Sequence, residues 1–149
     1  VYVEDEYPNI LFAKDAEIYT INGLSTLVCG GAYSVDKYYR MAHGWSWWAS
    51  EQPTPETKRR VLESLELLEN KVDIILTHTC PYKYIPYEVF LPGIDQSTVD
   101  ISTEEFLDKL DDLVGYKRWY CGHYHTDKTI DKVEFLFNSV KEFGAGLIK

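Results

Sequence analysis

The chain has 149 residues, 45% hydrophobic and 26% charged, which are the proportions of one globular domain and exclude a disordered or fibrous protein. Its net charge of −9 argues against a protein that coats the phosphate backbone of a nucleic acid, and it suits cations as ligands. Three cysteines argue against a disulfide framework, and no apolar run is long enough for a membrane span, so we expect a cytoplasmic protein.

The first segment of the chain, residues 1–9, is polar and acidic and is interrupted by Pro8. Such a segment is not typical of the start of a compact domain, and the first residue is Val1 rather than methionine. We therefore expect the chain to be a fragment of a longer protein.

A β-hairpin is predicted next, because Asn22-Gly23 separates the β-prone runs 17–21 and 24–29. Residues 32–48 then read as an irregular, aromatic loop with one short helical turn. Loops of this kind often line binding sites, and Tyr33, Arg40 and His43 are candidate contacts to a phosphate group. Alternatively, the three tryptophans of this loop form a hydrophobic plug that closes the core.

Two helices and three further strands follow. Thr54-Pro55 begins a helix that should bury Val61, Leu62, Leu65 and Leu68. Ser102 and Glu105 form the sequence pattern of a capping box, ahead of a helix that should bury Phe106, Leu110 and Leu113 and end at Gly115. Apolar runs predict strands over 73–77 and 117–121, and the alternation of polar and apolar residues predicts a half-buried strand over 132–138. Residues 81–99 are expected to form a long loop.

Histidines follow two of these predicted strands. His78 comes directly after the strand 73–77, and Gly122-His123-Tyr124-His125 comes directly after the strand 117–121. Ligands of α/β sheets bind at the carboxyl ends of the strands, so three imidazoles could converge there. If the second strand stays extended, His123 and His125 project to the same side, and Gly122 allows a backbone or an ion to come close.

Three interpretations of these histidines compete. His78, His123 and His125 could be ligands of a hydrolytic metal centre, since imidazole suits transition metals. His78, Cys80, Cys121 and His123 could instead form a closed, structural zinc site in a non-catalytic binding domain. In the third, the histidines are ordinary surface residues of a tyrosine-rich binding module.

Residues 76–81 (LTHTCP) and 121–125 (CGHYH) resemble the last two signature blocks of the calcineurin-like metallophosphoesterases. Residues 28–34 also resemble the strand and Gly-Gly turn that precede those blocks in bacterial and phage members. The resemblance spans the whole chain as a single domain, 1–149. It implies an α/β fold, part of a four-layer α/β/β/α sandwich with mixed β-sheets.

The resemblance also implies two divalent metal ions, of Mn, Fe, Zn or Ni, bridged by a carboxylate and a hydroxide. His78 and His123 would bind the second ion and His125 the first. The family's Asp-x-His, Gly-Asp and Gly-Asn-His blocks are absent from this chain. We therefore expect the parent protein to be a hydrolase acting on a phosphorylated substrate, completed by a missing N-terminal half. No catalytic residue is assigned in this chain, which by itself would hold an incomplete site.

Overall fold

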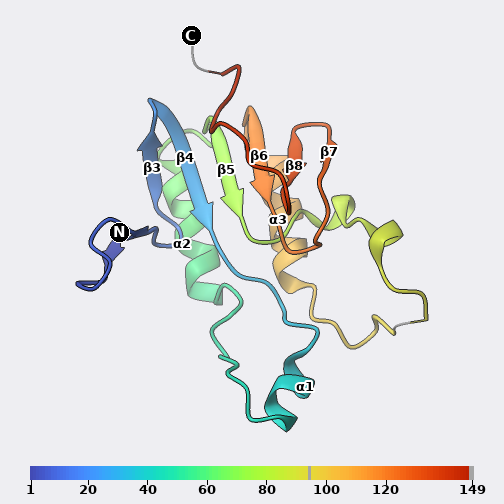
Figure 1. Ribbon diagram of the computed structural model, residues 1–149. Helices are drawn as coiled ribbons and strands as arrows, with labels where there is room; N and C mark the ends of the chain where they lie inside the picture. Colours follow the sequence, from blue (N-terminus) through green and yellow to red (C-terminus); the bar gives the residue numbers. More distant parts are fainter. Residues whose placement is uncertain (94, 148–149) are drawn as a thin grey trace.

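A six-stranded mixed β-sheet organises the protein, as a computed structural model that describes residues 1–93 and 95–147 shows (Figure 1). The four inner strands run parallel to one another, and each edge strand is antiparallel to its neighbour. In spatial order the strands are β3 (Ile18–Ile21), β4 (Leu24–Cys29), β5 (Ile74–Thr77), β6 (Arg118–Cys121), β8 (Val133–Phe135) and β7 (Lys128–Ile130). The expected α/β class with a mixed sheet is confirmed.

The predicted hairpin forms the first edge of this sheet. Asn22 and Gly23 both adopt positive φ (50° and 77°), and they join β3 to β4 so that Ile21 pairs with Leu24. Positive φ at both central residues matches the right-handed twist of the strands, which is why Asn-Gly favours this turn. Parallel strands need long crossovers. Here the connections from β4 to β5 and from β5 to β6 carry helices, whereas the connection from β6 to β8 runs through β7.

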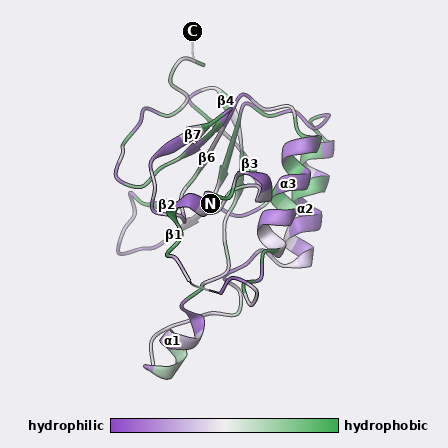
Figure 2. Cartoon of the chain, turned by 90° about the vertical axis from the view of Figure 1, so that its right-hand side faces the viewer, coloured by the Kyte–Doolittle hydropathy of each residue, from purple (hydrophilic) through white to green (hydrophobic). Residues whose placement is uncertain are grey.

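Helices α2 (Pro55–Glu66) and α3 (Ser102–Leu113) cover the same face of the sheet (Figure 2). Thr54 caps α2 as predicted, because its hydroxyl accepts the N–H of Thr57 at 3.1 Å. The main core lies between these helices and the sheet. It is built around the fully buried side chains Leu27, Val61, Leu65, Ile75, Leu107, Leu110, Trp119, Val133 and Phe135.

Several predicted details of the helices are wrong. Leu62 lies on the solvent side of α2 and Leu68 lies beyond its end at Glu66, so both are exposed rather than buried. Ser102 does not cap α3. Its own N–H is bound by the carboxylate of Asp100 at 2.9 Å, and Leu113, in the last turn, is 47% exposed. The side chain that binds the first N–H of the helix is therefore that of Asp100, and the expected capping box of Ser102 and Glu105 does not form.

The opposite face of the sheet carries a smaller apolar cluster. Leu24, Ile74 and Tyr120 are its buried members, and Leu76 and Leu136 are half-buried beside them. Among the described residues, only the C-terminal segment packs on this cluster, through Phe143 and Leu147. This face is therefore covered much less completely than the helical face.

Three parts of the chain extend from this body. A two-stranded hairpin, β1 (Tyr2–Val3) and β2 (Leu11–Phe12), was not predicted, and its four residues are exposed. α1 (Lys37–Ala42) projects beyond the sheet (Figure 1). The predicted tryptophan plug is wrong, because Trp45 and Trp48 beside α1 are 56% and 66% exposed. Residues 81–99 contain two short 3₁₀ turns, Tyr82–Tyr84 and Tyr87–Val89. Every helix in the described residues is too short or too polar to cross a lipid bilayer.

Candidate functional site

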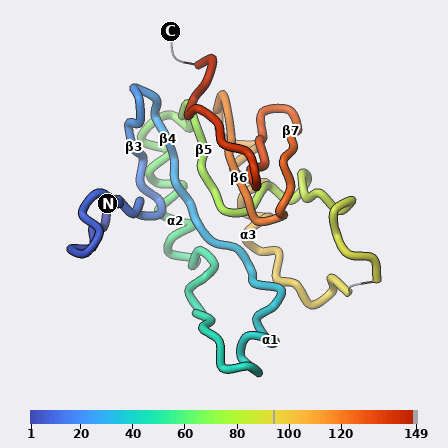
Figure 3. Tube along the Cα trace, in the orientation of Figure 1, coloured from blue at the N-terminus to red at the C-terminus, as the bar shows by residue number. Residues whose placement is uncertain are grey.

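The two loops that carry the candidate histidines meet at the carboxyl edge of β5 and β6. These strands are parallel neighbours, so their carboxyl ends lie at the same edge of the sheet (Figure 3). His78 follows β5 directly, and His123 lies two residues after β6. The N–H of Gly122 donates to the carbonyl of His78 at 2.9 Å, which continues the ladder by one hydrogen bond and ties one loop to the other.

Partly buried hydrogen bonds hold the backbone on both sides of His78. The indole N–H of Trp119, a fully buried residue of β6, donates to the Thr77 hydroxyl at 2.7 Å. That hydroxyl donates in turn to the carbonyl of Thr79 at 2.5 Å. Because the donor belongs to the neighbouring strand, the position of the His78 loop depends on the pairing of β5 with β6.

His123 sits at the centre of a tight turn. The N–H of Tyr124 donates to the carbonyl of Gly122 at 2.8 Å, and the φ of His123 is +67°. His125 also has positive φ, at +49°. The strand does not stay extended through His125, because β6 ends at Cys121 and the chain then turns, so the condition for both histidines to project to one side is not met. A left-handed conformation in two non-glycine residues is a local strain of the kind that gathers at functional sites.

The side chains of His78 and His123 lie in direct contact. Nε2 of His78 is 3.1 Å from Nδ1 of His123, and the ring centroids are 5.0 Å apart. This distance fits a hydrogen bond in which one neutral ring donates its N–H to the other. It also fits two nitrogens that share one cation, since ligands at ~2.0–2.1 Å from a tetrahedral zinc stand about 3.3 Å apart.

Both rings of this pair favour the neutral form. Burial in the surrounding protein, together with the charges of His78 and His125, lowers the pKa of His123 to about 4. The same two causes, packing of the protein first and His125 second, lower the pKa of His78. Neutral imidazole is the form that binds metals, so at neutral pH the pair has its nitrogen lone pairs available.

The third candidate, His125, stands apart from this pair. Its side chain is exposed and its ring stacks on Phe137, with centroids 4.7 Å apart and planes at 19°. It is near enough for its charge to affect the pKa of both other histidines. Nevertheless, no set of three His, Cys, Asp or Glu side chains in the described residues is arranged as metal ligands. The structure thus brings together two of the three predicted ligands.

The fit of these residues to a metal is therefore partial. Two neutral imidazoles with nitrogens 3.1 Å apart suit one transition-metal ion. They do not suit the two-ion centre that the family resemblance implies, because no carboxylate of the described residues joins them in a ligand set. Among the described residues, no third ligand stands beside the pair.

The alternative zinc set is not assembled either. Cys80 and Cys121 are buried in the main core, and the Cys121 thiol contacts the carbonyl of Glu134 at 3.8 Å. Burial raises the pKa of Cys80 to about 12 and that of Cys121 also well above its usual value. Zinc binds the thiolate, so apolar burial of both thiols disfavours this site.

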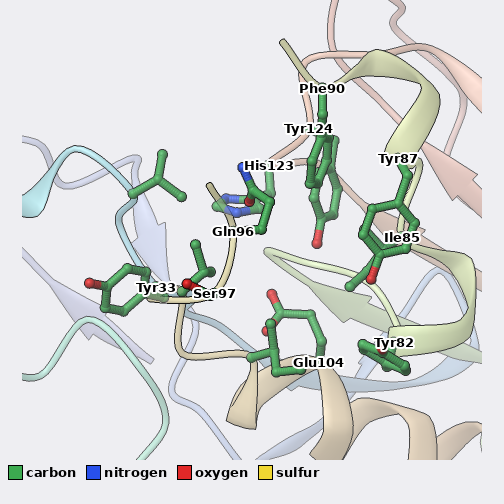
Figure 4. Close-up of a pocket in the computed structure, with 13 residues that line it drawn as sticks. Tyr33, Tyr82, Ile85, Tyr87, Phe90, Gln96, Ser97, Glu104, His123 and Tyr124 are labelled. Carbon is green, nitrogen blue, oxygen red and sulfur yellow. The ribbon is translucent and has the colours of Figure 1, made fainter. Parts of the chain in front are cut away.

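A cavity of about 420 Å³ opens beside the histidine pair (Figure 4). His123 and Tyr124 line it together with the predicted residue Tyr33, whereas Arg40 and His43 are not among its described lining residues. Arg40 forms an ion pair with Asp36 at 2.7 Å on the projecting helix α1. His43 contacts the carbonyl of Tyr39 through Nδ1 at 2.8 Å, at the end of the same helix.

The cavity also contains a residue that sequence reasoning missed. Glu104 lies in the first turn of α3, where a glutamate normally faces solvent, yet it is buried and lines the cavity. Its carboxylate accepts the Thr79 hydroxyl at 2.8 Å. Thr79 is the residue after His78, so this hydrogen bond joins α3 to the histidine loop.

Comparisons with known proteins add nothing to this geometry, since no protein-family model, no curated protein and no solved structure matches the chain.

Proposed function

We propose that this protein is part of a metal-dependent phosphoesterase, which hydrolyses a phosphate mono- or diester, and that His78 and His123 are two ligands of one of its metal ions. The observation that carries the proposal is the 3.1 Å distance between Nε2 of His78 and Nδ1 of His123 at the carboxyl edge of two parallel strands. The lowered pKa of both rings supports it, because neutral rings can bind a cation.

The family resemblance of residues 76–81 and 121–125 supplies the reaction class. Two divalent ions about 3.5–4 Å apart supply a hydroxide at neutral pH and neutralise charge on the phosphoryl oxygens. His125 is proposed as a ligand of the other ion. Its ring would leave Phe137 to reach it, and its exposure permits that movement.

The proposal includes a second polypeptide region that supplies the carboxylate ligands. The described part of the chain shows no carboxylate in a ligand set with the histidines. The less covered face of the sheet supports the presence of such a region. Half-buried Leu76 and Leu136 lie there beside Phe143 and Leu147 of the C-terminal segment, and a second sheet packed on this face would give the four-layer sandwich.

Metal binding by the chain itself is the first test. Titration with Co²⁺, followed by its visible absorption, should show one weak site that is lost in His78→Ala and in His123→Ala. His43→Ala is the matched control, because His43 lies on α1 and should leave the titration unchanged. Equal Co²⁺ binding by all four proteins would show that the pair is a hydrogen-bonded couple without a metal role.

Hydrolysis is the second test. The chain alone should not hydrolyse p-nitrophenyl phosphate or its bis-ester in Mn²⁺ above a control of buffer and metal. Addition of the upstream half, fused or as a separate polypeptide, should produce activity, and His125→Ala should then abolish it. Turnover by residues 1–149 alone, removed by a chelator and by His125→Ala, would refute the need for a second region.

A further inference from the structure

The lining of the cavity beside His123 suits a flat ring. Most of its described lining is aromatic or aliphatic, and its volume of about 420 Å³ lies in the range of small-molecule sites. Phe90 and Tyr124 form one wall, with ring centroids 5.9 Å apart and planes at 17°. Tyr87 extends this wall, with its ring centroid 5.3 Å from that of Phe90. An aromatic wall of this kind favours contact with another planar ring.

Glu104 places a carboxylate at the base of this apolar space. The residue is only 4% exposed, and Figure 4 shows its carboxyl group directed into the cavity, below the hydroxyl of Tyr124. Oε1 accepts the Thr79 hydroxyl at 2.8 Å. Oε2 is buried and has no hydrogen-bond partner among the described residues.

No basic side chain of the described residues forms an ion pair with Glu104. The nearby Lys58 instead donates to the carbonyl of Ser102 at 2.8 Å. A buried carboxylate oxygen without a hydrogen-bond donor destabilises the fold. Buried polar groups are otherwise nearly always paired, so an unpaired one that faces a cavity indicates a ligand that pairs with it.

We propose that this cavity binds a planar aromatic ring that carries an N–H donor, the chemistry of an amino-substituted purine. The ring lies against the wall of Phe90 and Tyr124, and its N–H donates to Oε2 of Glu104. Recognition by an otherwise unpaired buried acceptor is selective, because a ring without the donor leaves that acceptor unsatisfied.

The cavity also has a place in the proposed reaction. His123 lines the cavity and contacts His78, so a ring bound there would hold the rest of its molecule close to the histidine pair. This step rests on the proposed function. In that case the bound ring belongs to the alcohol that is esterified to the phosphate, as the base of a nucleotide does.

The test compares two nucleosides that differ only in the donor. Adenosine carries an exocyclic amino group, and purine riboside is the same molecule without it. Isothermal titration of the unmodified protein, with a chelator present, should show adenosine binding at least about tenfold more tightly. Neither nucleoside carries a phosphate and no metal is present, so binding is independent of the phosphoesterase proposal. If the protein binds adenosine but the completed protein hydrolyses no ester, only the proposed function fails.

Variants identify the group that recognises the donor. Glu104→Gln keeps the shape of the side chain but places an amide N–H₂ in the cavity, and it should remove the preference for adenosine. Glu105→Gln, one residue further along α3 and exposed, should keep it. Equal affinity for the two nucleosides, a preference that survives in Glu104→Gln, or no binding of either would overturn the proposal. The comparison in the unmodified protein decides the question even if Glu104→Gln fails to fold.

Discussion

Glu104 is an ionisable residue in a buried, largely apolar environment. Burial raises the pKa of its carboxyl group, and the Thr79 hydroxyl and the N-terminus of α3 offset this only in part. A raised pKa in the folded state means that folding favours the protonated form. Glu104 therefore stabilises the fold below its unfolded-state pKa, and this contribution is lost as the pH rises through its folded-state pKa.

Glu104→Gln should consequently make the protein more stable at neutral pH. The amide has no charge to desolvate, so the free energy of unfolding should rise by roughly 1 kcal/mol at pH 7. The gain should shrink as the pH falls through the raised folded-state pKa, and it should be lost below the unfolded-state pKa of about 4.3, where the wild-type carboxyl is protonated in both states. Urea denaturation of both proteins between pH 4 and 8 measures this. A gain that does not change with pH would show that Glu104 does not titrate in the folded protein.

His123 offers a second test at the level of one residue. Its φ of +67° is strained for any side chain, whereas glycine adopts it freely. His123→Gly should therefore be more stable than His123→Ala by about 1 kcal/mol in chemical denaturation. Gly122→Ala is the control, since φ there is not positive and an added Cβ would lie 3.5 Å from the Leu136 carbonyl, an ordinary contact. Equal stability of the two His123 variants would show that the turn relaxes.

Local sequence predicted only part of the candidate site. It placed His78 and His123 at strand ends, and parallel pairing of those strands is enough to bring them together. It could not predict that the chain turns at His123, since that depends on a hydrogen bond from Tyr124 to Gly122. Glu104 was missed because its partner Thr79 is 25 residues away and because Glu at a helix start normally favours solvent.

At the level of elements, α3 shows how a plausible cap can be displaced. The sequence favours Ser102, but the carboxylate of Asp100 accepts the Ser102 N–H and also binds Gln52 at 3.1 Å. Asp100→Ala should therefore lower the free energy of unfolding by about 1 kcal/mol, while Ser102→Ala should change it by only a few tenths. Thermal denaturation of the two variants distinguishes the caps, and the reverse order would restore Ser102 as the cap.

The elements that sequence predicted well are those with local signals. Asn22-Gly23 and Thr54-Pro55 determine a turn and a helix start within a few residues. The short strands β1, β2 and β7 have no such signal. β7 forms by pairing with the free edge of β8 (Val133–Phe135), so it depends on tertiary structure rather than on its own sequence.

At the level of the whole molecule, the two faces of the sheet are covered unequally. The C-terminal segment reaches the less covered face at Gly144, where an added Cβ would lie 2.3 Å from Cδ1 of Leu24. Gly144→Ala should therefore separate this segment from the sheet and destabilise the protein by more than 1 kcal/mol.

Gly146→Ala is the matched control for this prediction. Both glycines have positive φ, at 68° and 79°, but nothing lies within 4 Å of a Cβ built at Gly146. The difference between the two variants in urea denaturation isolates the steric clash from the backbone strain. Equal destabilisation would show that the segment contributes little to covering this face.

The hydrogen bond that ties the loop of Gly122 to the loop of His78 has a consequence for the folding pathway. His78 and His123 are 45 residues apart, and the chain between them includes α3. Closing so long a loop is slow, so the imidazole pair exists only in molecules that have already passed this step. The effect of an added divalent ion on the refolding and unfolding rates would then show when β5 and β6 pair. Faster refolding with the ion would place the pairing of β5 and β6 in the transition state, and slower unfolding alone would place it afterwards.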